Sequence, residues 1–469
     1  MNTSINFSLN GNQEAADCRA DMTVLEWLRI EKRLRGSKEG CAEGDCGACS
    51  VLVRRADSEN YHPANSCIML IGQLDGGALI TVEGLAGLGE QGHAVQIEMA
   101  KNGSSQCGFC TPGIVCALSG LLNENSNPSD SDIHDALAGN LCRCTGYRPI
   151  VEAAQAAART VGESSLDTKR DGQMQSVAGN GDSCVYHPAT LEELHTLRKS
   201  NPDAVLLAGG TDSALAVAHA KARWPQFTST RNIGALRNVE IRGDILCVGG
   251  AVTWQEFLPF AQQYWPGFAT LIRRFGSVHI RSMGTLAGNL ATASPIGDGA
   301  PALLALGAKV VLSGPDGNRE VDLNAFFTGY RQADIRDDEI ISSICVPLPK
   351  PDEIFSVYKV SKRYDQDIST VCGAFWGVLE DGQMSDCRIA FGGMAATPIR
   401  VPSAEAAMIG KKWDNESCES ARQAIEAQLS PMTDFRGSAD YRSRVAANLM
   451  VRFLKETAGS EEPMQVMAL

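Results

Sequence analysis

The chain has 469 residues, enough for about two to four domains, and carries 42 Lys and Arg against 55 Asp and Glu, a formal charge of −13. Its basic residues are not clustered, which argues against nucleic acid or an anionic membrane surface as a partner. No long uninterrupted apolar stretch and no signal peptide is visible, so we expect a soluble protein in a reducing, cytoplasmic compartment.

The N-terminal part has the order of elements found in a ferredoxin-like β-grasp. Residues 5–9 alternate as a strand, Thr23 begins a capped helix, and a second strand covers 50–54. The loop before that strand contains cysteines in the spacing C-x4-C-x2-C, with a fourth cysteine further on, as in plant-type 2Fe–2S proteins. These cysteines are Cys41, Cys46, Cys49 and Cys67. Nearby glycines (Gly40, Gly44 and Gly47) are expected to let backbone N–H groups approach the sulfur atoms.

A helical pattern follows from about residue 92, and a second cysteine group lies at the ends of its segments. The expected helices are 93–101, 112–123, 130–137 and 150–160, and the cysteines are Cys107, Cys110, Cys142 and Cys144. A C-x2-C pair with a C-x-C pair could also close a tetrahedral zinc site, so this group is less diagnostic by itself. Zinc suits the spacing of the first group badly, and a disulfide scaffold is not needed in a chain of this length.

The eight other cysteines lie singly in the sequence, and nearly all of them are expected to be buried small hydrophobes or inert surface thiols. They are Cys18, Cys116, Cys184, Cys247, Cys345, Cys372, Cys387 and Cys418.

Two further segments are interpreted as connections. Gly87, Gly89 and Gly92 match G-x-G-x-x-G, but no βαβ unit surrounds them, so we expect no dinucleotide site there. The polar stretch 161–182 is expected to be an interdomain linker, and Pro349-Lys350-Pro351 marks another boundary. Strands over 356–359, 373–379 and 387–391 and two late helices are expected in the last part.

Two glycine-rich turns favour a flavin site. Ala208–Asp212 follows a strand-like segment and is expected to open a helix, and Gly284–Asn289 supplies a second set of backbone N–H donors for a pyrophosphate. Asp298 could hold a ribityl hydroxyl. One glycine turn is usually only a turn, but two turns with this carboxylate favour phosphate binding.

These motifs together resemble the molybdenum hydroxylases over about residues 5–400. The resemblance is carried by Lys38–Cys49, Gln106–Gly113, Gly139–Pro149, Leu207–Asp212 and Gly276–Asp298. Within the family, the chain is similar to the small subunits of bacterial xanthine dehydrogenases, which carry both clusters and the flavin on one polypeptide. The molybdopterin portion is absent before the chain stops at Leu469, so the resemblance implies a separate, large molybdopterin-binding subunit and a dimer of heterodimers.

The implied fold is α+β and multidomain. Its parts are a β-grasp 2Fe–2S ferredoxin-like domain (1–85), a helical-bundle 2Fe–2S domain (86–160), the linker (161–182), an α+β FAD-binding domain that is not a Rossmann fold (183–350) and a C-terminal α+β flavoprotein domain (351–469).

The resemblance also assigns the cofactor residues. Cys41, Cys46, Cys49 and Cys67 would hold the cluster nearer the flavin, and Cys107, Cys110, Cys142 and Cys144 the cluster nearer the molybdenum. Tyr330 would lie over the nicotinamide side of the flavin. The FAD contacts would be Leu206, Leu207, Ala208, Gly209, Gly210, Thr211, Asp212, Ser213, Phe275, Thr285, Leu286, Ala287, Gly288, Asn289, Asp298, Ile341 and Lys359.

The implied activity is that of an NAD-dependent xanthine dehydrogenase, which oxidises hypoxanthine and xanthine to urate. Electrons would pass from the partner's molybdenum centre through two 2Fe–2S clusters to FAD and NAD, so this chain needs no catalytic residue for purine oxidation. His93, His134, His195 and His279 are therefore expected to be structural. The equivalent subunit of a hydroxylase for aldehydes or aromatic thioesters, and a non-enzymatic ferredoxin–flavin sensor, remain alternatives, and oxygen remains a possible acceptor in place of NAD.

Overall fold

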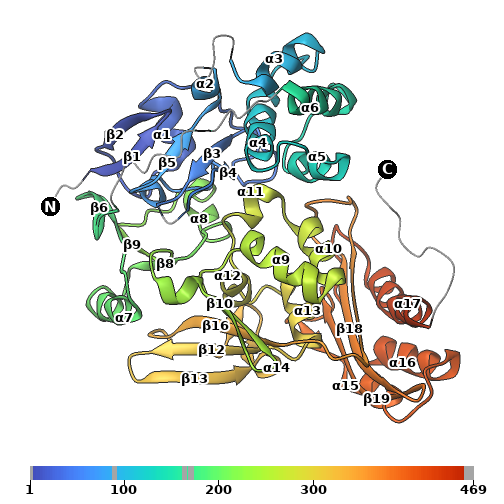
Figure 1. Ribbon diagram of the computed structural model, residues 1–469. Coiled ribbons are helices and arrows are strands. Elements are labelled where there is room, and N and C mark those ends of the chain that lie inside the picture. Colours follow the sequence, from blue (N-terminus) through green and yellow to red (C-terminus); the bar gives the residue numbers. More distant parts are fainter. Residues whose placement is uncertain (1–3, 57, 87–91, 161–165, 167–173, 459–469) are drawn as a thin grey trace. The chain divides into compact units, whose positions relative to one another are not determined.

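The computed structural model of the chain describes residues 4–56, 58–86, 92–160, 166 and 174–458. Its contacts divide these residues into two compact units, and Figure 1 labels many of their helices and strands. The first unit contains the described residues up to Gly234 together with Gly276–Gly284, and the second contains Ala235–Phe275 and the described residues from Thr285 onward. Within these residues, no helix is both long enough and apolar enough to cross a membrane.

The first unit begins with a mixed five-stranded sheet in the order β2-β1-β5-β3-β4. Its strands are β1 (Ile5–Leu9), β2 (Asn12–Ala16), β3 (Ser50–Arg54), β4 (His62–Asn65) and β5 (Ala78–Ile80). Helix α1 (Val24–Ile30) begins at Thr23, whose hydroxyl accepts the Glu26 N–H, and the 3-10 helix η1 covers Ile71–Leu74. The Phe7 and Trp27 rings meet edge to face at 5.3 Å, which joins the sheet to the helix. This arrangement confirms the expected β-grasp domain.

Helices follow, as the sequence pattern predicts. They are α2 (Val82–Leu85), α3 (Ala94–Lys101), α4 (Thr111–Glu124), α5 (Asp130–Leu137) and α6 (Arg148–Thr160). Helix α4 is buried along most of its length, with Ile114, Cys116 and Leu118 fully buried. The cysteine pairs lie immediately before α4 and between α5 and α6, so the helices fix the approach of the two loops.

The remainder of the first unit is a small sheet in the order β6-β7-β9-β8 with short helices. Its elements are β6 (Val177–Asn180), β7 (Ser183–Tyr186), α7 (Leu191–Ser200), β8 (Val205–Leu207), α8 (Leu215–Ala218), β9 (Gln226–Ser229) and α11 (Val278–Arg281). Residues 177–180, expected to be linker, are thus a strand paired with β7. Most of 161–173 and of the G-x-G-x-x-G segment lies outside the described residues.

The second unit contains an antiparallel sheet in the order β10-β11-β16-β12-β13, which confirms that the flavin domain is not a Rossmann fold. The strands are β10 (Val239–Arg242), β11 (Ile245–Gly249), β12 (Lys309–Gly314), β13 (Gly317–Asp322) and β16 (Ile340–Pro347), with a hairpin of β14 (Phe327–Gly329) and β15 (Gln332–Ala333). The associated helical segments are η2 (Gly234–Arg237), α9 (Trp254–Tyr264), α10 (Pro266–Phe275), α12 (Leu286–Ala291), α13 (Gly299–Ala305) and α14 (Leu323–Phe326). Side chains from the sheet and from α9, α10, α12 and α13 form one apolar core.

A second antiparallel sheet of the same unit carries the last helices. Its strands are β17 (Glu353–Val360), β18 (Val371–Glu380), β19 (Gln383–Gly392) and β20 (Ile399–Arg400), followed by α15 (Pro402–Met408), α16 (Asn415–Gln428) and α17 (Ala439–Thr457). The three expected strands are confirmed, although they are longer than predicted. The sequence predicted two late helices where the structure has three, because α15 is short and begins at a proline.

Candidate redox cofactor sites

The structure brings the four cysteines of the first group together. The Cys46 and Cys67 thiols both donate to Cys41, and Cys67 also donates to Cys49. The β3–β4 hairpin explains how Cys67 reaches the loop, because Ser50 pairs with Asn65 and the residues beyond both strand ends become neighbours. Two of the thiols, Cys49 and Cys67, are buried.

The loop around Cys41 is organised to stabilise negative charge on sulfur. The N–H groups of Glu43, Asp45 and Cys46 point to the Cys41 sulfur, each at 3.4 Å. Hydrogen bonds from the Cys46 and Cys67 thiols, assisted by these backbone groups, hold the pKa of Cys41 far below its ordinary value. A loop that lowers a thiol pKa in this way favours thiolate ligands for a metal centre.

The three loop glycines do not share one role. A Cβ at Gly40 would lie 2.7 Å from the Cys46 sulfur, which is the expected crowding. At Gly44 (φ +80°) it would instead meet Ile68, and at Gly47 (φ +66°) it would lie 2.0 Å from the carbonyl oxygen of Gly139. Gly47 therefore permits a close approach between the two cysteine loops, a role that the sequence pattern did not indicate.

The cysteines of the second group form two thiol pairs near the surface. Cys144 donates to Cys107 and Cys110 donates to Cys142, while Cys107 and Cys144 are exposed. Tyr147 holds this loop, since its hydroxyl accepts the Cys142 N–H at 2.8 Å and donates to the Asn140 carbonyl at 3.1 Å. Sequence reasoning missed this role of Tyr147.

Direct hydrogen bonds join the two cysteine loops. The Leu141 N–H donates to the Cys46 carbonyl at 2.9 Å, so the residue before Cys142 contacts the backbone of a cysteine in the first group. The Asn140 side chain donates to the Gly47 carbonyl at 3.0 Å and to the Ser50 hydroxyl at 3.1 Å. The two groups therefore belong to one continuous hydrogen-bonded structure.

The segment Gly276–Gly284 contacts this junction. His279 Nε2 lies 2.9 Å from the Ser50 hydroxyl, and burial together with the Arg281 charge lowers the pKa of His279 to about 3, so its ring is neutral. The fully buried Arg281 guanidinium forms a bidentate ion pair with Asp135 (2.6 and 3.1 Å) and donates to the Gly276 carbonyl. Two residues of the expected flavin motif therefore pack against the cluster domains.

The expected FAD residues 206–213 form the end of β8 and the turn beyond it. A Cβ at Gly209 would lie 1.8 Å from the carbonyl oxygen of Met283, so glycine is required there by backbone packing. The turn does not open a helix directly, because α8 begins only at Leu215 and has four residues. Gly209 and Thr211 nevertheless line a small cavity together with Ala64 and Ile68, which places this loop beside the first cysteine group.

The second glycine-rich stretch does begin a helix. Thr285 precedes α12, and its hydroxyl accepts the Gly288 N–H at 2.9 Å. The side-chain oxygen of Asn289 is buried without a hydrogen-bond partner, which is unusual for a protein acceptor and is consistent with a ligand donor at this position.

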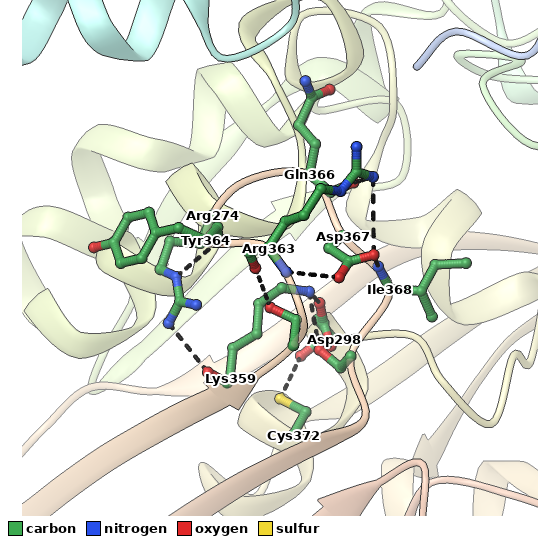
Figure 2. A network of polar contacts seen from close by, with 11 residues as sticks. Arg274, Asp298, Lys359, Arg363, Tyr364, Gln366, Asp367, Ile368 and Cys372 are labelled. Carbon is green, nitrogen blue, oxygen red and sulfur yellow. Dashed lines mark hydrogen bonds and ion pairs between the residues drawn. The ribbon is translucent and has the colours of Figure 1, made fainter. Parts of the chain in front are cut away.

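Asp298 and Lys359, both expected to contact FAD, bind each other (Figure 2). Ser369 donates to the Asp298 carboxylate and accepts from Lys359 at 2.9 Å. The Lys359 and Asp298 side chains are only 1% and 6% exposed. The carboxylate expected to hold a ribityl hydroxyl is therefore already bound by a lysine and a serine, and flavin contacts of these side chains remain a prediction.

Arg274 fixes the loop that follows Lys359. Its guanidinium stacks on the Tyr364 ring at 4.4 Å and donates to the Lys359 and Tyr364 carbonyls, as Figure 2 shows. Its own carbonyl accepts the Gln366 N–H at 3.0 Å.

The three remaining predicted contacts differ in exposure. Phe275 is half-buried against Trp254 with ring centroids 4.8 Å apart, and Ile341 is a buried core residue of β16. Tyr330, at the turn of the β14–β15 hairpin, is 64% exposed and can meet a ligand or a partner.

Comparison with known families supports the cofactors. Residues 7–71 match the 2Fe-2S iron-sulfur cluster binding domain, 81–155 a 2Fe-2S binding domain, 176–349 the FAD binding domain in molybdopterin dehydrogenase and 356–457 the CO dehydrogenase flavoprotein C-terminal domain. Two 2Fe–2S clusters and FAD, as predicted, are therefore the cofactors of the chain, and zinc is not supported for the second cysteine group.

Curated relatives resemble nearly the whole chain. A xanthine dehydrogenase from Emericella nidulans is 31% identical over 98% of this chain and 39% of its own length. Xanthine dehydrogenase 1 of Arabidopsis thaliana is 29% identical over 93% of this chain and 38% of its own length. The chain thus spans about two-fifths of the length of these relatives.

Solved structures resemble more than half of the chain. A carbon monoxide dehydrogenase from Hydrogenophaga pseudoflava matches with a TM-score of 0.55 and 27% identity, over 57% of this chain and 94% of that chain. A quinoline 2-oxidoreductase from Pseudomonas putida 86 matches with a TM-score of 0.54 at 24% identity, over 58% of this chain and 96% of that chain, and shows the fold alone.

Proposed function

We propose, from the premise that the chain has the 2Fe–2S and FAD domain architecture of the molybdenum hydroxylases, that it is the electron-transfer subunit of a xanthine dehydrogenase. In this role it receives electrons from a molybdenum centre in a larger partner subunit and delivers them to NAD. The substrates of the complex are hypoxanthine and xanthine, and the product is urate.

The cysteine groups fit the iron–sulfur clusters. Contacts link all four thiols of the first group and join those of the second in two pairs, and backbone N–H groups around Cys41 can stabilise the charge of a bound cluster. Bound 2Fe–2S clusters carry single electrons and bound FAD exchanges one or two, which is the chemistry needed between a substrate and NAD.

The two cysteine groups differ in exposure to solvent, and this difference indicates which group is nearer the partner subunit and which is nearer the flavin. Cys49 and Cys67 are buried, whereas Cys107, Cys144, Phe109 and Leu141 are exposed. The second group is therefore the end that a partner subunit can approach. The first group lies beside the 206–213 loop and is the end nearer the flavin.

The single observation that carries the proposal is the hydrogen-bonded junction between the cysteine loops. The Leu141 N–H binds the Cys46 carbonyl, so the two cysteine loops are held next to each other, which favours a relay for single electrons. A free carrier or a sensor would need no second cluster coupled to the first.

The relatives favour a purine substrate over the alternatives. The xanthine dehydrogenases match 98% and 93% of this chain, so they carry both cluster domains and the flavin domains on one polypeptide. The carbon monoxide dehydrogenase chain covers only 57% of this chain. The equivalent subunit of an aldehyde or aromatic thioester hydroxylase remains the second candidate.

The test is to purify the chain alone and with its co-expressed large partner. The chain alone should contain about four iron and four labile sulfide with one FAD, and should oxidise NADH with an artificial dye but not oxidise xanthine. The complex should convert xanthine to urate with NAD. Xanthine oxidation by the isolated chain would overturn the assignment, and turnover of aldehydes or thioesters alone by the complex would favour the second candidate.

Replacing Tyr330 tests the NAD contact. Because its ring is exposed at a hairpin turn, Tyr330→Ala should slow NADH–dye oxidation at least several-fold, mainly through a higher KM, while FAD content stays near one per chain. Tyr441→Ala removes another exposed ring, from α17, and should leave the rate unchanged. Equal rates for the two variants would refute the contact.

A further inference from the structure

Cys247 and Cys345, isolated in the sequence, are paired in the structure. They occupy directly opposite positions on the antiparallel strands β11 and β16, and their sulfur atoms are 3.1 Å apart. Both residues are buried, as expected for single cysteines, but each also has a thiol as its neighbour, which the sequence does not show. The pair is separate from the two cysteine groups assigned to iron.

The strand register places this pair where a disulfide can close. The Gly250 N–H binds the Ser342 carbonyl at 2.8 Å, and the Leu348 N–H binds the Asp244 carbonyl at 2.7 Å. The opposite residues 250 and 342, and likewise 244 and 348, are therefore hydrogen-bonded pairs of the two strands. Cys247 and Cys345 belong to the alternate row, which is not hydrogen-bonded and in which opposite Cα atoms are about 4.5 Å apart. That separation lies within the range of disulfides, about 4.4–6.8 Å.

The pair lies on the face of the sheet opposite to the apolar core. The neighbouring residues Leu246 and Val248 point into the core, whereas the same cross-strand row continues from Cys247 to Glu240 and from Cys345 to Lys309. Charged side chains on this face are half exposed, including Lys309 and its ion-pair partner Glu320. The two sulfur atoms therefore lie just beneath a polar surface, and their residues are 6% and 8% exposed.

The thiols are protected from large reagents but not from small ones. Burial and the neighbouring Cys247 raise the pKa of Cys345 to about 12, so this thiol is protonated at neutral pH. A bulky disulfide reagent cannot approach sulfur atoms so little exposed, whereas a peroxide is about as small as two water molecules. The second thiol is already in contact, so the step after the first oxidation needs no large movement.

We propose that Cys247 and Cys345 are a reversible dithiol–disulfide site that hydrogen peroxide oxidises. One sulfur attacks a peroxide oxygen, the O–O bond breaks, and the thiol proton leaves with the departing oxygen as water, which gives a sulfenic acid. The second thiol displaces the hydroxyl group as another water, and the S–S bond forms. Two thiols and one hydrogen peroxide thus yield one disulfide and two waters, with sulfur oxidised and oxygen reduced.

The disulfide would join residues that are 98 positions apart in the sequence and would fix β11 to β16 in the middle of the sheet. The proposal does not depend on the proposed electron-transfer function, because it concerns thiols that bind no cofactor. A thiol reductant would reverse it.

Peptide mass spectrometry after peroxide treatment tests the proposal directly. The full chain, with its cofactors, is treated with hydrogen peroxide, its remaining thiols are alkylated, and it is digested with trypsin without reduction. Cleavage after Arg242, Arg273, Arg336 and Lys359 releases peptides 243–273 and 337–359, each with one cysteine. We expect these peptides as one cross-linked species, two hydrogens lighter than their sum, and as separate alkylated peptides after dithiothreitol.

Matched variants decide between the possible outcomes. Cys247→Ser and Cys345→Ser should each abolish the cross-link, whereas Cys387→Ser, which removes a thiol from the core of the C-terminal sheet, should leave it intact. Oxidation of the partly exposed Cys184, followed in the same digest, shows that the peroxide dose suffices. Full alkylation of both peptides when Cys184 is oxidised, or separate sulfinic acids on Cys247 and Cys345, would overturn the proposal.

Discussion

Cys67 is the residue on which the first cluster depends most, because it lies far from Cys49 in the sequence yet donates to both Cys41 and Cys49. Cys67→Ser should remove this cluster only, so the iron content should fall from about four to about two per chain and one of two paramagnetic signals should disappear. Iron analysis and electron paramagnetic resonance check this.

A buried cysteine of the same domain provides the control. Cys18→Ser should keep full iron content, since Cys18 packs in the sheet core without a sulfur neighbour in the described contacts. Full iron and both signals in Cys67→Ser would show that the first group is assigned incorrectly.

His279 makes the stability of the first unit depend on pH. Its pKa is lowered to about 3 in the folded state against an ordinary value of 6.5, so between these values the unfolded chain binds a proton that the folded chain does not. Stability from this residue is therefore complete above about pH 6.5 and decreases as the pH falls, by up to about 1.4 kcal/mol per pH unit.

Denaturant unfolding between pH 5 and 7.5 measures this dependence. His279→Gln can keep the hydrogen bond to Ser50 but cannot titrate. The free energy of unfolding of this variant should therefore depend less steeply on pH than that of the wild type, and the difference in slope should correspond to about one bound proton. Parallel pH dependences for the wild type and the variant would exclude His279 as the source.

Residue spacing predicts the cysteines but not the side chains that hold their loops. Thiol contacts link the members of the first group and pair those of the second, although Cys67, Cys142 and Cys144 lie far from the rest of their groups in the sequence. Tyr147 was missed although its partners are only five and seven positions away, and Asn140 and His279 were missed or taken as incidental because their partners lie up to 229 positions away. Only a tertiary contact reveals such roles.

Helices α5 and α11 are joined by a buried ion pair that can be tested at the scale of elements. Asp135→Ala leaves the fully buried Arg281 guanidinium without its carboxylate, so we expect a loss of about 3 kcal/mol in the free energy of unfolding. Urea unfolding of the holoprotein measures this loss.

The exposed pair of Arg148 and Glu152 on α6 is the matched control. Glu152→Ala removes a carboxylate from an ion pair in water and should cost about 0.5 kcal/mol or less. Similar losses in the two variants would mean that the Asp135–Arg281 pair does not stabilise the junction.

At the level of elements, helices were predicted better than turns and connections. The helices over 93–160 follow an apolar periodicity that one sequence displays. The end of the expected linker is strand β6, because its pairing with β7 is not visible in a polar composition. The turn at Gly209 was read as a phosphate loop, although its glycine is also required by the approach of Met283.

For the whole molecule, removal of FAD should stop electron transfer between NADH and the iron–sulfur clusters. The predicted FAD residues include 206–213 and Thr285–Asn289. The FAD-free chain should keep about four iron and its dithionite-reducible clusters, but NADH should no longer reduce them. It should also unfold at a lower temperature, since a tightly bound ligand stabilises by about 4 kcal/mol at a thousandfold excess over Kd.

Visible absorption during reduction, with iron analysis, checks this prediction, and added FAD should restore the NADH reaction. Reduction of the clusters by NADH without FAD would mean that electrons enter the chain elsewhere. The order of domains was predictable from the motifs, whereas the membership of Gly276–Gly284 in the first unit was not, because it depends on the buried contacts of Arg281 and His279.

The first compact unit consists of two separate stretches of the chain, so it can be completed only after Gly276–Gly284 has been synthesised. Chains emerge from the ribosome N-terminus first and fold domain by domain, so both cysteine loops are exposed well before Gly276–Gly284 is translated. Until then Asp135 lacks its guanidinium and Ser50 lacks its imidazole, and the loop junction is incomplete. The contacts that complete the junction between the cysteine loops can therefore form only after both loops have been synthesised.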